Sequence, residues 1–353
     1  MKLLAVALGL FVAGCAAERG HSVILVTIDG VRWQEVFGGA DLKLLEERKE
    51  TAETAKKAFW RESAEERRSA LVPFLWDTVA NEGQLLGHVG LGSPVIVTNR
   101  YKISYPGYHE LLSGFPSDTI SSNQKVPNPN LTVLEWLHGR PGFRGSVAAY
   151  CSWDVFPSIL NRERCGFPVD TGEPSHNPSL LRRLSTEVQP PWEGAVYDAF
   201  VFHAGMEYLR EKKPRVFYFA FGDSDEWAHK GSYDDYLEAI QRTDGWLREL
   251  WATIQSIPEY RGKTSLIVTS DHGRGDNPAE WRSHNSKVNG AGYIWVAALG
   301  PKIPALGVRS EHEPFMQSQI AATIASLVGE DYPSGVTRAA PPLPIVAPGT
   351  GTK

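Results

Sequence analysis

The sequence predicts an α/β fold in which a mostly parallel central sheet carries helices on both faces, as a three-layer sandwich. Strand and helix patterns alternate from Ser22 to about Gly329, which is typical of such folds. Two strand candidates, VILVTIDG at 23–30 and SLIVTSDHG at 265–273, are continuous apolar runs rich in β-branched residues. Continuous rather than alternating apolar runs indicate strands that are buried on both faces.

The elements follow one another without an internal repeat, so one domain is expected over residues 22–340. The strand candidates are 23–28, 87–97, 145–150, 215–221, 265–269 and 293–299. The helical candidates are 42–80, with a break expected near Pro73, then 192–212, 234–257 and 314–328. Residues 341–353 are rich in Pro and Gly and predict a flexible tail.

Two segments depart from this alternation. Residues 46–68 are dense in charge and in helix formers, which favours a solvated helical face. Residues 157–191 are irregular, and loops of that length are often lids or walls of a site. We therefore expect substrate selection to depend on these two segments.

The N-terminus resembles an export signal. Met1-Lys2 precedes an apolar stretch at 3–12 that is too short to span a bilayer. Val12-Ala13-Gly14-Cys15 then resembles a bacterial lipobox. The resemblance implies a signal peptide at 1–14, a lipid on Cys15, a linker at 15–21 and an anchor on the periplasmic face of the outer membrane. The alternative is a plain secretory signal and a soluble periplasmic protein.

Composition narrows the function classes. The chain has 353 residues, 42% hydrophobic and 22% charged, with a formal net charge of -5. This balance predicts no nucleic-acid partner. Besides Cys15 the chain has Cys151 and Cys165, and in an exported protein such a pair is a disulfide candidate. Two unpaired thiols are the alternative.

Acidic residues follow three of the predicted strands. Asp29 and Asp271 come at the ends of the two apolar runs, and Asp225 follows the strand at 215–221. An Asp at one strand end is usually a helix N-cap. Because ligands of open α/β sheets bind outside the carboxyl ends of the strands, three such acids favour a shared metal site.

Histidines accompany these acids. Asp225 and His229 are four residues apart, which places both on one face of a helix. His272 directly follows Asp271, and His284 lies a short distance beyond. A set of Asp and His ligands without Cys suits Zn²⁺, with Mn²⁺ as the alternative in one or both sites.

Ser104 lies shortly before a predicted helix at Tyr108–Ser113. The free N–H groups at a helix start favour an anion. A serine at this place is either an N-cap or a nucleophile activated by a metal ion.

Five motifs follow one another along the chain: TIDGVRW at 27–33, SYPGYHELLSG at 104–114, DSDEWAH at 223–229, SDHG at 270–273 and RSHN at 282–285. Together they resemble the alkaline phosphatase superfamily, and within it the type I phosphodiesterase / nucleotide pyrophosphatase-like branch. The resemblance implies two metal ions, expected to be Zn²⁺. It assigns one ion to Asp225, His229 and His284. It assigns the other to Asp29, Asp271, His272 and the oxygen of Ser104.

The resemblance also implies an activity, the hydrolysis of small-molecule phosphate esters by two-metal in-line displacement. Ser104 would be the nucleophile, a covalent phosphoserine would form and be hydrolysed, and the ions would lie about 4 Å apart. Asn123 resembles the donor to a phosphate oxygen, although an ordinary loop Asn is the alternative. Arg162, Arg164 and Lys102 are candidates for the cationic clamp of a monoesterase, and the alternative for the two arginines is that they are solvated loop charges. Monoester and diester substrates both stay open.

One motif departs from the common pattern of this branch. Pro106-Gly107-Tyr108 stands where Pro-Asn-His is usual. Sulfatases of the superfamily carry Cys/Ser-x-Pro-x-Arg, and Tyr108 does not match that Arg. A sulfate-ester hydrolase or a phosphoryl-transfer enzyme, such as a mutase or transferase, is the second hypothesis. A non-catalytic metal-binding lipoprotein is a third, from another class.

Overall fold

The structure is a computed structural model that describes residues 20–48, 50–173, 179–310 and 312–347. The predicted signal peptide, Cys15 and most of the linker lie outside the described residues, as do the last residues of the tail. Among the helices of the described ranges, none combines the length and apolar character needed to cross a bilayer.

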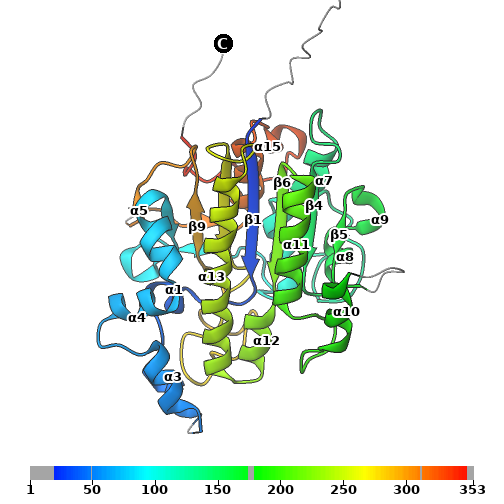
Figure 1. Cartoon of the computed structure of the whole chain (residues 1–353). Coiled ribbons are helices and arrows are strands. Elements are labelled where there is room, and N and C mark those ends of the chain that lie inside the picture. Colours follow the sequence, from blue (N-terminus) through cyan, green and yellow to red (C-terminus); the bar gives the residue numbers. More distant parts are fainter. Residues whose placement is uncertain (1–19, 49, 174–178, 311, 348–353) are drawn as a thin grey trace, which may run out of the picture.

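An eight-stranded sheet forms the centre of the molecule (Figure 1). Its middle strand, β1 (Ser22–Ile28), pairs in parallel with β6 (Val216–Phe221) and with β7 (Thr264–Thr269). The order is β10-β2-β9-β7-β1-β6-β4-β5, and β9 is antiparallel to both of its neighbours. The remaining strands of this sheet are β2 (Gln84–Leu86), β4 (Val147–Cys151), β5 (Val169–Asp170), β9 (Val296–Leu299) and β10 (Gly307–Val308). A small second sheet contains β3 (Val95–Ile96), β8 (Tyr293–Ile294) and β11 (Phe315–Met316).

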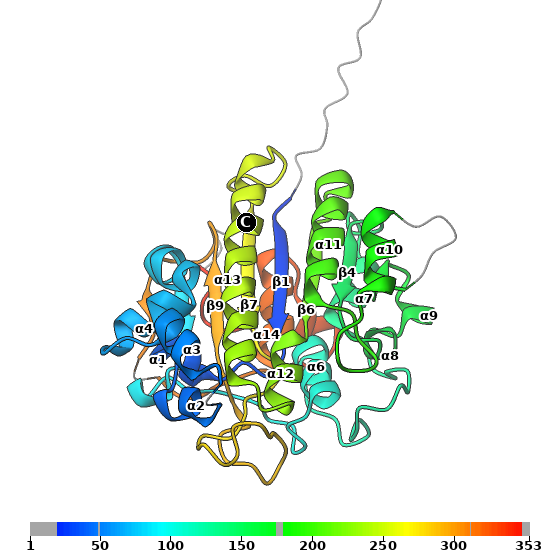
Figure 2. The ribbon, with the colours of Figure 1, turned by 60° about the horizontal axis from the view of Figure 1, so that its bottom comes forward.

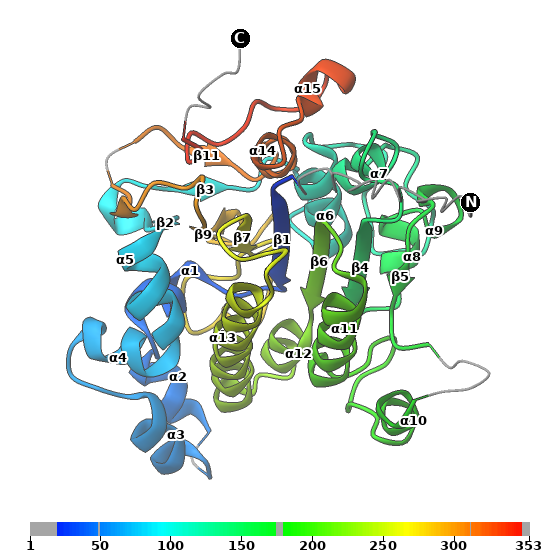
Figure 3. The same ribbon diagram turned by 45° about the horizontal axis from the view of Figure 1, so that its top comes forward.

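Helices cover both faces of the large sheet, as Figure 3 shows. One face carries α11 (Asp198–Lys212), α12 (Asp223–His229) and α13 (Tyr233–Ser256), and the other carries α6 (Ser104–Ser113), α7 (Val133–His138) and α14 (Gln319–Leu327). Alternate residues of β1 pack into two separate apolar cores, Val23 and Leu25 into one and Ile24 and Val26 into the other. The predicted α/β three-layer class is confirmed.

The shorter helices surround these layers. They are α1 (Trp33–Gly38), α2 (Leu42–Glu47), α3 (Ala52–Phe59), α4 (Ala64–Leu71), a π-helical turn (Leu75–Val79), α5 (Ala80–Glu82), a 3-10 turn (Val89–Leu91), α8 (Phe156–Ile159), α9 (Arg162–Cys165), α10 (Leu180–Glu187) and α15 (Tyr332–Gly335).

Three predicted elements are divided in the structure. Of the strand expected at 87–97, only Val95–Ile96 is a strand, β3. The residues before it turn, because Gly87 and Gly92 both have positive φ, at 108° and 64°. The strand expected at 293–299 is shared between the two sheets as β8 and β9. The helix expected at 42–80 has several breaks, and a capping box at Ser63 starts one of the pieces.

Candidate active site

The parallel strands end at one rim of the sheet and bring three carboxylates together. Asp29 directly follows β1, Asp271 follows β7, and Asp225 lies in the first turn of α12 after β6. Figure 2 shows α12 and α6 beside the end of β1. All three carboxylates are buried. The register explains this arrangement, because the last residues of β1 pair with those of β6 and β7.

The first predicted set of metal ligands converges. Nε2 of His229 lies 3.1 Å from Oδ2 of Asp225 and 3.0 Å from Nε2 of His284. Nε2 of His284 is 3.9 Å from Oδ1 of Asp225. The one-turn spacing in α12 therefore places Asp225 and His229 around a common point, and the loop after β7 adds His284.

The second predicted set converges beside the first. Nε2 of His272 lies 3.4 Å from Oδ1 of Asp29, 3.3 Å from Oδ2 of Asp271 and 3.3 Å from Oγ of Ser104. It also lies 4.0 Å from Oδ1 of Asp225, so the two sets adjoin. The rings of His272 and His284 stack with their centroids 3.7 Å apart.

Backbone carbonyls orient both histidines of this stack. Nδ1 of His272 is 3.0 Å from the carbonyl oxygen of Gly273, and Nδ1 of His284 is 3.2 Å from that of Lys102. Because a carbonyl accepts only, each Nδ1 carries the proton and each Nε2 presents its lone pair to the site. Burial lowers the pKa of His284 to about 4 and the pKa of His272 well below its usual value, so both rings stay neutral.

Asp29 and Asp271 each keep one carboxylate oxygen without a hydrogen-bond donor. Oδ1 of Asp29 and Oδ2 of Asp271 are buried without a hydrogen-bond donor. Burial, and then the charge of Asp271, raise the pKa of Asp29. Burial and then Asp225 raise the pKa of Asp271 to about 7. Unpaired buried carboxylates are costly unless a cation joins them. This donor set of carboxylates and imidazoles therefore fits two divalent cations.

Ser104 is the first residue of α6 and not its N-cap, which is Ile103. The N-cap interpretation of Ser104 is therefore wrong. Its Oγ faces a pocket of about 140 Å³. The pocket is lined by Asp29, Ser104, Asn123, Trp153, Ala195, Gly222, Asp225, Glu226, His229 and His284. Asn123 reaches it as predicted, and its Oδ1 accepts a 2.9 Å hydrogen bond from the backbone N–H of Tyr105.

The predicted cationic clamp is wrong. Arg162 pairs with Glu173 and donates a 2.8 Å hydrogen bond to the carbonyl of Val169. Arg164 binds both carboxylate oxygens of Glu135, at 2.6 and 2.8 Å. Acids and carbonyls of their own surroundings hold both guanidinium groups, although Nε of Arg162 is buried without a partner. Neither arginine lines the pocket of Ser104, and Lys102, the third candidate, does not line it either.

The predicted disulfide is also wrong, since Cys151 and Cys165 are free buried thiols. Cys151 ends β4 inside the sheet. Sγ of Cys165 faces the carbonyl oxygens of Phe167 and Arg162, at 3.5 and 3.7 Å. Burial raises the pKa of both thiols, which makes them unreactive.

Two buried side chains support the candidate ligands: Arg274, which no sequence motif marks, and Tyr108, which lies in a motif but was given no role by it. Arg274 contacts the carboxylate of Asp225 and donates to the backbone carbonyls of Asp225 and Arg282, at 3.0 and 2.7 Å. Burial alone would raise the pKa of Asp225, but Arg274 and His229 outweigh it and hold that pKa well below its usual value. The hydroxyl of Tyr108 donates to Asp29 at 2.9 Å.

Solved structures define the class of fold. The chain is similar to a protein of the alkaline phosphatase superfamily from Vibrio parahaemolyticus, with a TM-score of 0.54 and 15% identity over 88% of this chain and 67% of that one. It is similar to murine ectonucleotide pyrophosphatase / phosphodiesterase 5, solved as an inactive variant with AMP, with a TM-score of 0.53 and 11% identity over 88% of this chain and 96% of that one. The fold is that of the alkaline phosphatase superfamily, whose members include phosphoester hydrolases and related enzymes.

The family follows from the sequence match over most of this fold. Residues 43–296 match the model of the type I phosphodiesterase / nucleotide pyrophosphatase family, and the chain belongs to that family. A curated relative, mouse GPI ethanolamine phosphate transferase 1, is 24% identical over 296 residues, which cover 76% of this chain. The match covers 30% of the length of that relative.

Proposed function

We propose that this protein is a metal-dependent hydrolase of phosphate esters that acts through Ser104. One observation supports this most strongly: Oγ of Ser104 lies 3.3 Å from Nε2 of His272 and shares a pocket with the carboxylates of Asp29 and Asp225. A binding protein has no use for a hydroxyl at the centre of such a donor set. Two Zn²⁺ ions suit the ligands best, with Mn²⁺ as the alternative.

The metal ions would be held by Asp225, His229 and His284, and by Asp29, Asp271, His272 and Ser104, and they would supply positive charge to the nucleophile, the phosphoryl oxygens and the leaving group. In the first step Oγ of Ser104 attacks phosphorus, its proton passes to solvent, and the bond from phosphorus to the leaving oxygen breaks. That oxygen takes up a proton. In the second step water attacks the phosphoserine, the bond from phosphorus to Oγ breaks, and Ser104 is restored.

Asn123 is the candidate donor to a non-bridging phosphate oxygen. Its carboxamide is fixed at the pocket by the hydrogen bond from the N–H of Tyr105 to Oδ1. That contact uses the acceptor of the side chain and leaves the amide N–H₂ for a phosphate oxygen. A donor placed in this way stabilises charge that develops in the transition state.

The charges of the pocket favour diesters over monoesters. Its lining contains the acids Asp29, Asp225 and Glu226 and neither Lys nor Arg. A monoester brings a second negative charge, which a monoesterase commonly meets with a cationic clamp. Since Arg162 and Arg164 are engaged elsewhere, the singly charged diester is the better substrate.

Phosphoryl transfer is the second candidate, because a curated relative is named as an ethanolamine phosphate transferase. The phosphoserine then passes its group to an alcohol in place of water. Sulfate esters rank lower, since the side chain at position 108 is a tyrosine bound to Asp29.

The test compares aryl phosphate, aryl phosphodiester and aryl sulfate, each with and without a chelator. We expect chelator-sensitive turnover, fastest on the diester and lost in Ser104→Ala. Ser256→Ala, at an exposed serine at the end of α13, is the matched control. In the presence of glycerol as an acceptor, a transferase should pass the phosphoryl group to glycerol, whereas a hydrolase should pass it to water. If none of the three esters is turned over in a chelator-sensitive way, the proposal that the protein is a metal-dependent enzyme is refuted.

We further propose that the chain is lipidated at Cys15 and anchored at the periplasmic face of the outer membrane. The support is the lipobox-like sequence at 12–15. Metabolic labelling with palmitate should mark the wild type but not Cys15→Ser, and labelled protein should fractionate with outer membranes. Soluble, unlabelled protein would instead indicate a plain secretory signal.

A further inference from the structure

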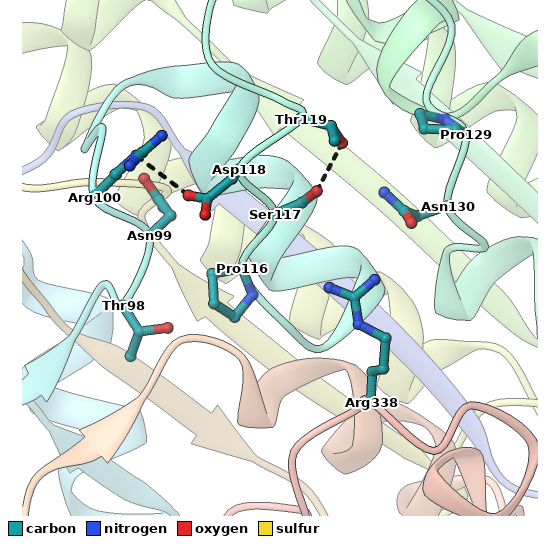
Figure 4. A pocket seen from close by; sticks show the side chains of 10 residues that line it. All are labelled: Thr98, Asn99, Arg100, Pro116, Ser117, Asp118, Thr119, Pro129, Asn130 and Arg338. Atoms are coloured by element: carbon teal, nitrogen blue, oxygen red, sulfur yellow. Dashed lines mark hydrogen bonds and ion pairs between the residues drawn. The ribbon is translucent and has the colours of Figure 1, made fainter.

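We propose that a polar hollow beside the active site binds the far end of an elongated phosphodiester, and that this end is sugar-like and anionic. The proposal rests on the proposed function and adds the class of substrate to it. The hollow has a volume of about 590 Å³, within the range of small-molecule sites. It is lined by Thr98, Asn99, Arg100, Pro116, Ser117, Asp118, Thr119, Pro129, Asn130 and Arg338 (Figure 4).

Side chains with a hydroxyl or an amide make up half of this lining. Ser117 and Thr119 share a hydrogen bond of 2.9 Å between their hydroxyls, on one wall of the hollow. Nδ2 of Asn130, on the opposite wall, is buried without a hydrogen-bond acceptor. Groups that both donate and accept are suited to the hydroxyls of a sugar. An unsatisfied buried donor is costly. The Asn130 side chain lines the hollow, and a turn of its amide toward a ligand oxygen would remove that cost.

The hollow also carries one uncompensated positive charge. Nε of Arg100 pairs with Oδ1 of Asp118 at 3.2 Å, so these two charges cancel. The guanidinium of Arg338 lies over the ring of Phe115, 4.1 Å from its centroid. Within the described part of the chain, no carboxylate forms an ion pair with Arg338. A planar guanidinium held by an aromatic ring is suited to a carboxylate or phosphate group.

A second hollow adjoins this one, and two of its lining residues flank Asn123 of the catalytic pocket in the sequence. It has a volume of about 320 Å³ and shares Thr119 and Pro129 with the first. Ser122 and Gln124 line it, whereas Asn123 between them lines the catalytic pocket. The same stretch of backbone, residues 116–130, therefore borders all three hollows.

Helix α6 fixes the distance between the reacting centre and the polar hollow. Ser104 begins α6, and Glu110 further along it accepts hydrogen bonds from the backbone N–H groups of Thr98 and Asn99, at 3.0 and 2.7 Å. Since a helix rises 1.5 Å per residue, the hollow lies on the order of 10 Å from the nucleophile. A short aryl ester ends before that point, and only an elongated substrate gains binding energy there.

The test uses a synthetic trisaccharide that ends in glucuronic acid and carries a nitrophenyl phosphodiester, beside the simple aryl phosphodiester. For Arg338→Gln and for Asn130→Ala we expect the ratio of kcat/KM for the long to the short substrate to fall at least tenfold. Arg140→Gln is the control, because Arg140 is an exposed arginine that pairs with Glu330 away from the hollow. It should leave the ratio unchanged.

Two comparisons make the outcome decisive. With a trisaccharide that ends in neutral glucose, Arg338→Gln should no longer lower the ratio of kcat/KM values, whereas Asn130→Ala should still lower it. Calorimetric binding of the acidic trisaccharide to Ser104→Ala protein should weaken at least tenfold on adding Arg338→Gln, whether or not the wild type turns it over. If the variants change neither the kcat/KM ratio nor the calorimetric affinity, the hollow is not a substrate subsite. Turnover of the short diester would in that case still support the proposed function.

Discussion

The hydroxyl of Tyr108 donates a hydrogen bond of 2.9 Å to Oδ2 of Asp29. Oδ1 of the same carboxylate faces His272 at 3.4 Å. Burial raises the pKa of Tyr108 well above its usual value, so the phenol stays protonated and keeps donating. The tyrosine at the position that departs from the usual motif thus orients the candidate metal ligand Asp29 from behind and does not line the pocket.

Tyr108→Phe should weaken metal binding about 10- to 100-fold, because partners behind a ligand fix its orientation. Competition with a chromophoric chelator measures this affinity directly. Tyr332→Phe is the matched control, since the hydroxyl of Tyr332 donates to the carbonyls of Ser113 and Leu131 away from the ligands. Equal metal affinity in wild type and Tyr108→Phe would contradict the assigned role.

Gly107 allows α6 to approach Asp271, a member of the second predicted set of metal ligands. A Cβ atom at this position would lie 2.5 Å from the carbonyl oxygen of Asp271, which is too close for any side chain. Gly107→Ala should therefore lower both the melting temperature and the metal content. Gly245→Ala is the control in α13, where a Cβ atom meets nothing within 4 Å, and it should stabilise the helix by about 0.5–1 kcal/mol. Normal metal content in Gly107→Ala would show that α6 can shift freely.

Arg274 compensates the charge of Asp225 inside the protein. Replacing it by Met leaves a buried carboxylate without that partner, which costs about 3–5 kcal/mol when a buried pair is broken. A bound cation replaces part of the lost charge, so the melting temperature of Arg274→Met should fall further in chelator than with Zn²⁺. Arg282→Met removes an exposed pair with Glu47 and should shift both temperatures little. Equal losses with and without metal would contradict this assignment.

The acidic residues that the structure brings together, as the sequence led us to expect, share a local cause. Asp29, Asp225 and Asp271 follow strands whose apolar character is visible in the chain, and parallel strands place their ends at one rim. Asp225 and His229 are four residues apart, so a helix places them on the same face whatever the tertiary structure around it. These features made the convergence of the three acids and His229 predictable before any geometry was known.

The misassigned residues depend on distant partners. Arg162 and Arg164 lie in a predicted loop, and their direction is set by Glu173 and Glu135, which sequence spacing does not reveal. Arg274 has no signal of its own, because its acceptor Asp225 is far away in the chain. Cys151 and Cys165 are close in sequence, but the end of a buried strand and a short helix give them separate surroundings.

A buried acid outside the active site should make stability depend on pH. Burial raises the pKa of Asp244 to about 7, although its carboxylate accepts hydrogen bonds from the N–H groups of Phe74 and Leu75, at 2.7 and 3.1 Å. The unfolded chain releases this proton near pH 4, whereas the folded protein holds it up to about pH 7. The contribution of the group to stability is therefore full below pH 4 and is lost as pH rises to 7, by at most about 1.4 kcal/mol per pH unit.

Asp244→Asn removes this titration but leaves one carboxamide oxygen for two N–H donors. We expect the variant to be less stable than the wild type near pH 4.5, with a gap in the free energy of unfolding that narrows steadily toward pH 7. Urea unfolding at closely spaced pH values, in chelator so that metal binding does not contribute, measures the gap. Over this range the wild type releases the proton of Asp244 when it unfolds, and the variant has no such proton. A stability gap that stays constant with pH would therefore show that Asp244 is ionised in the folded protein throughout.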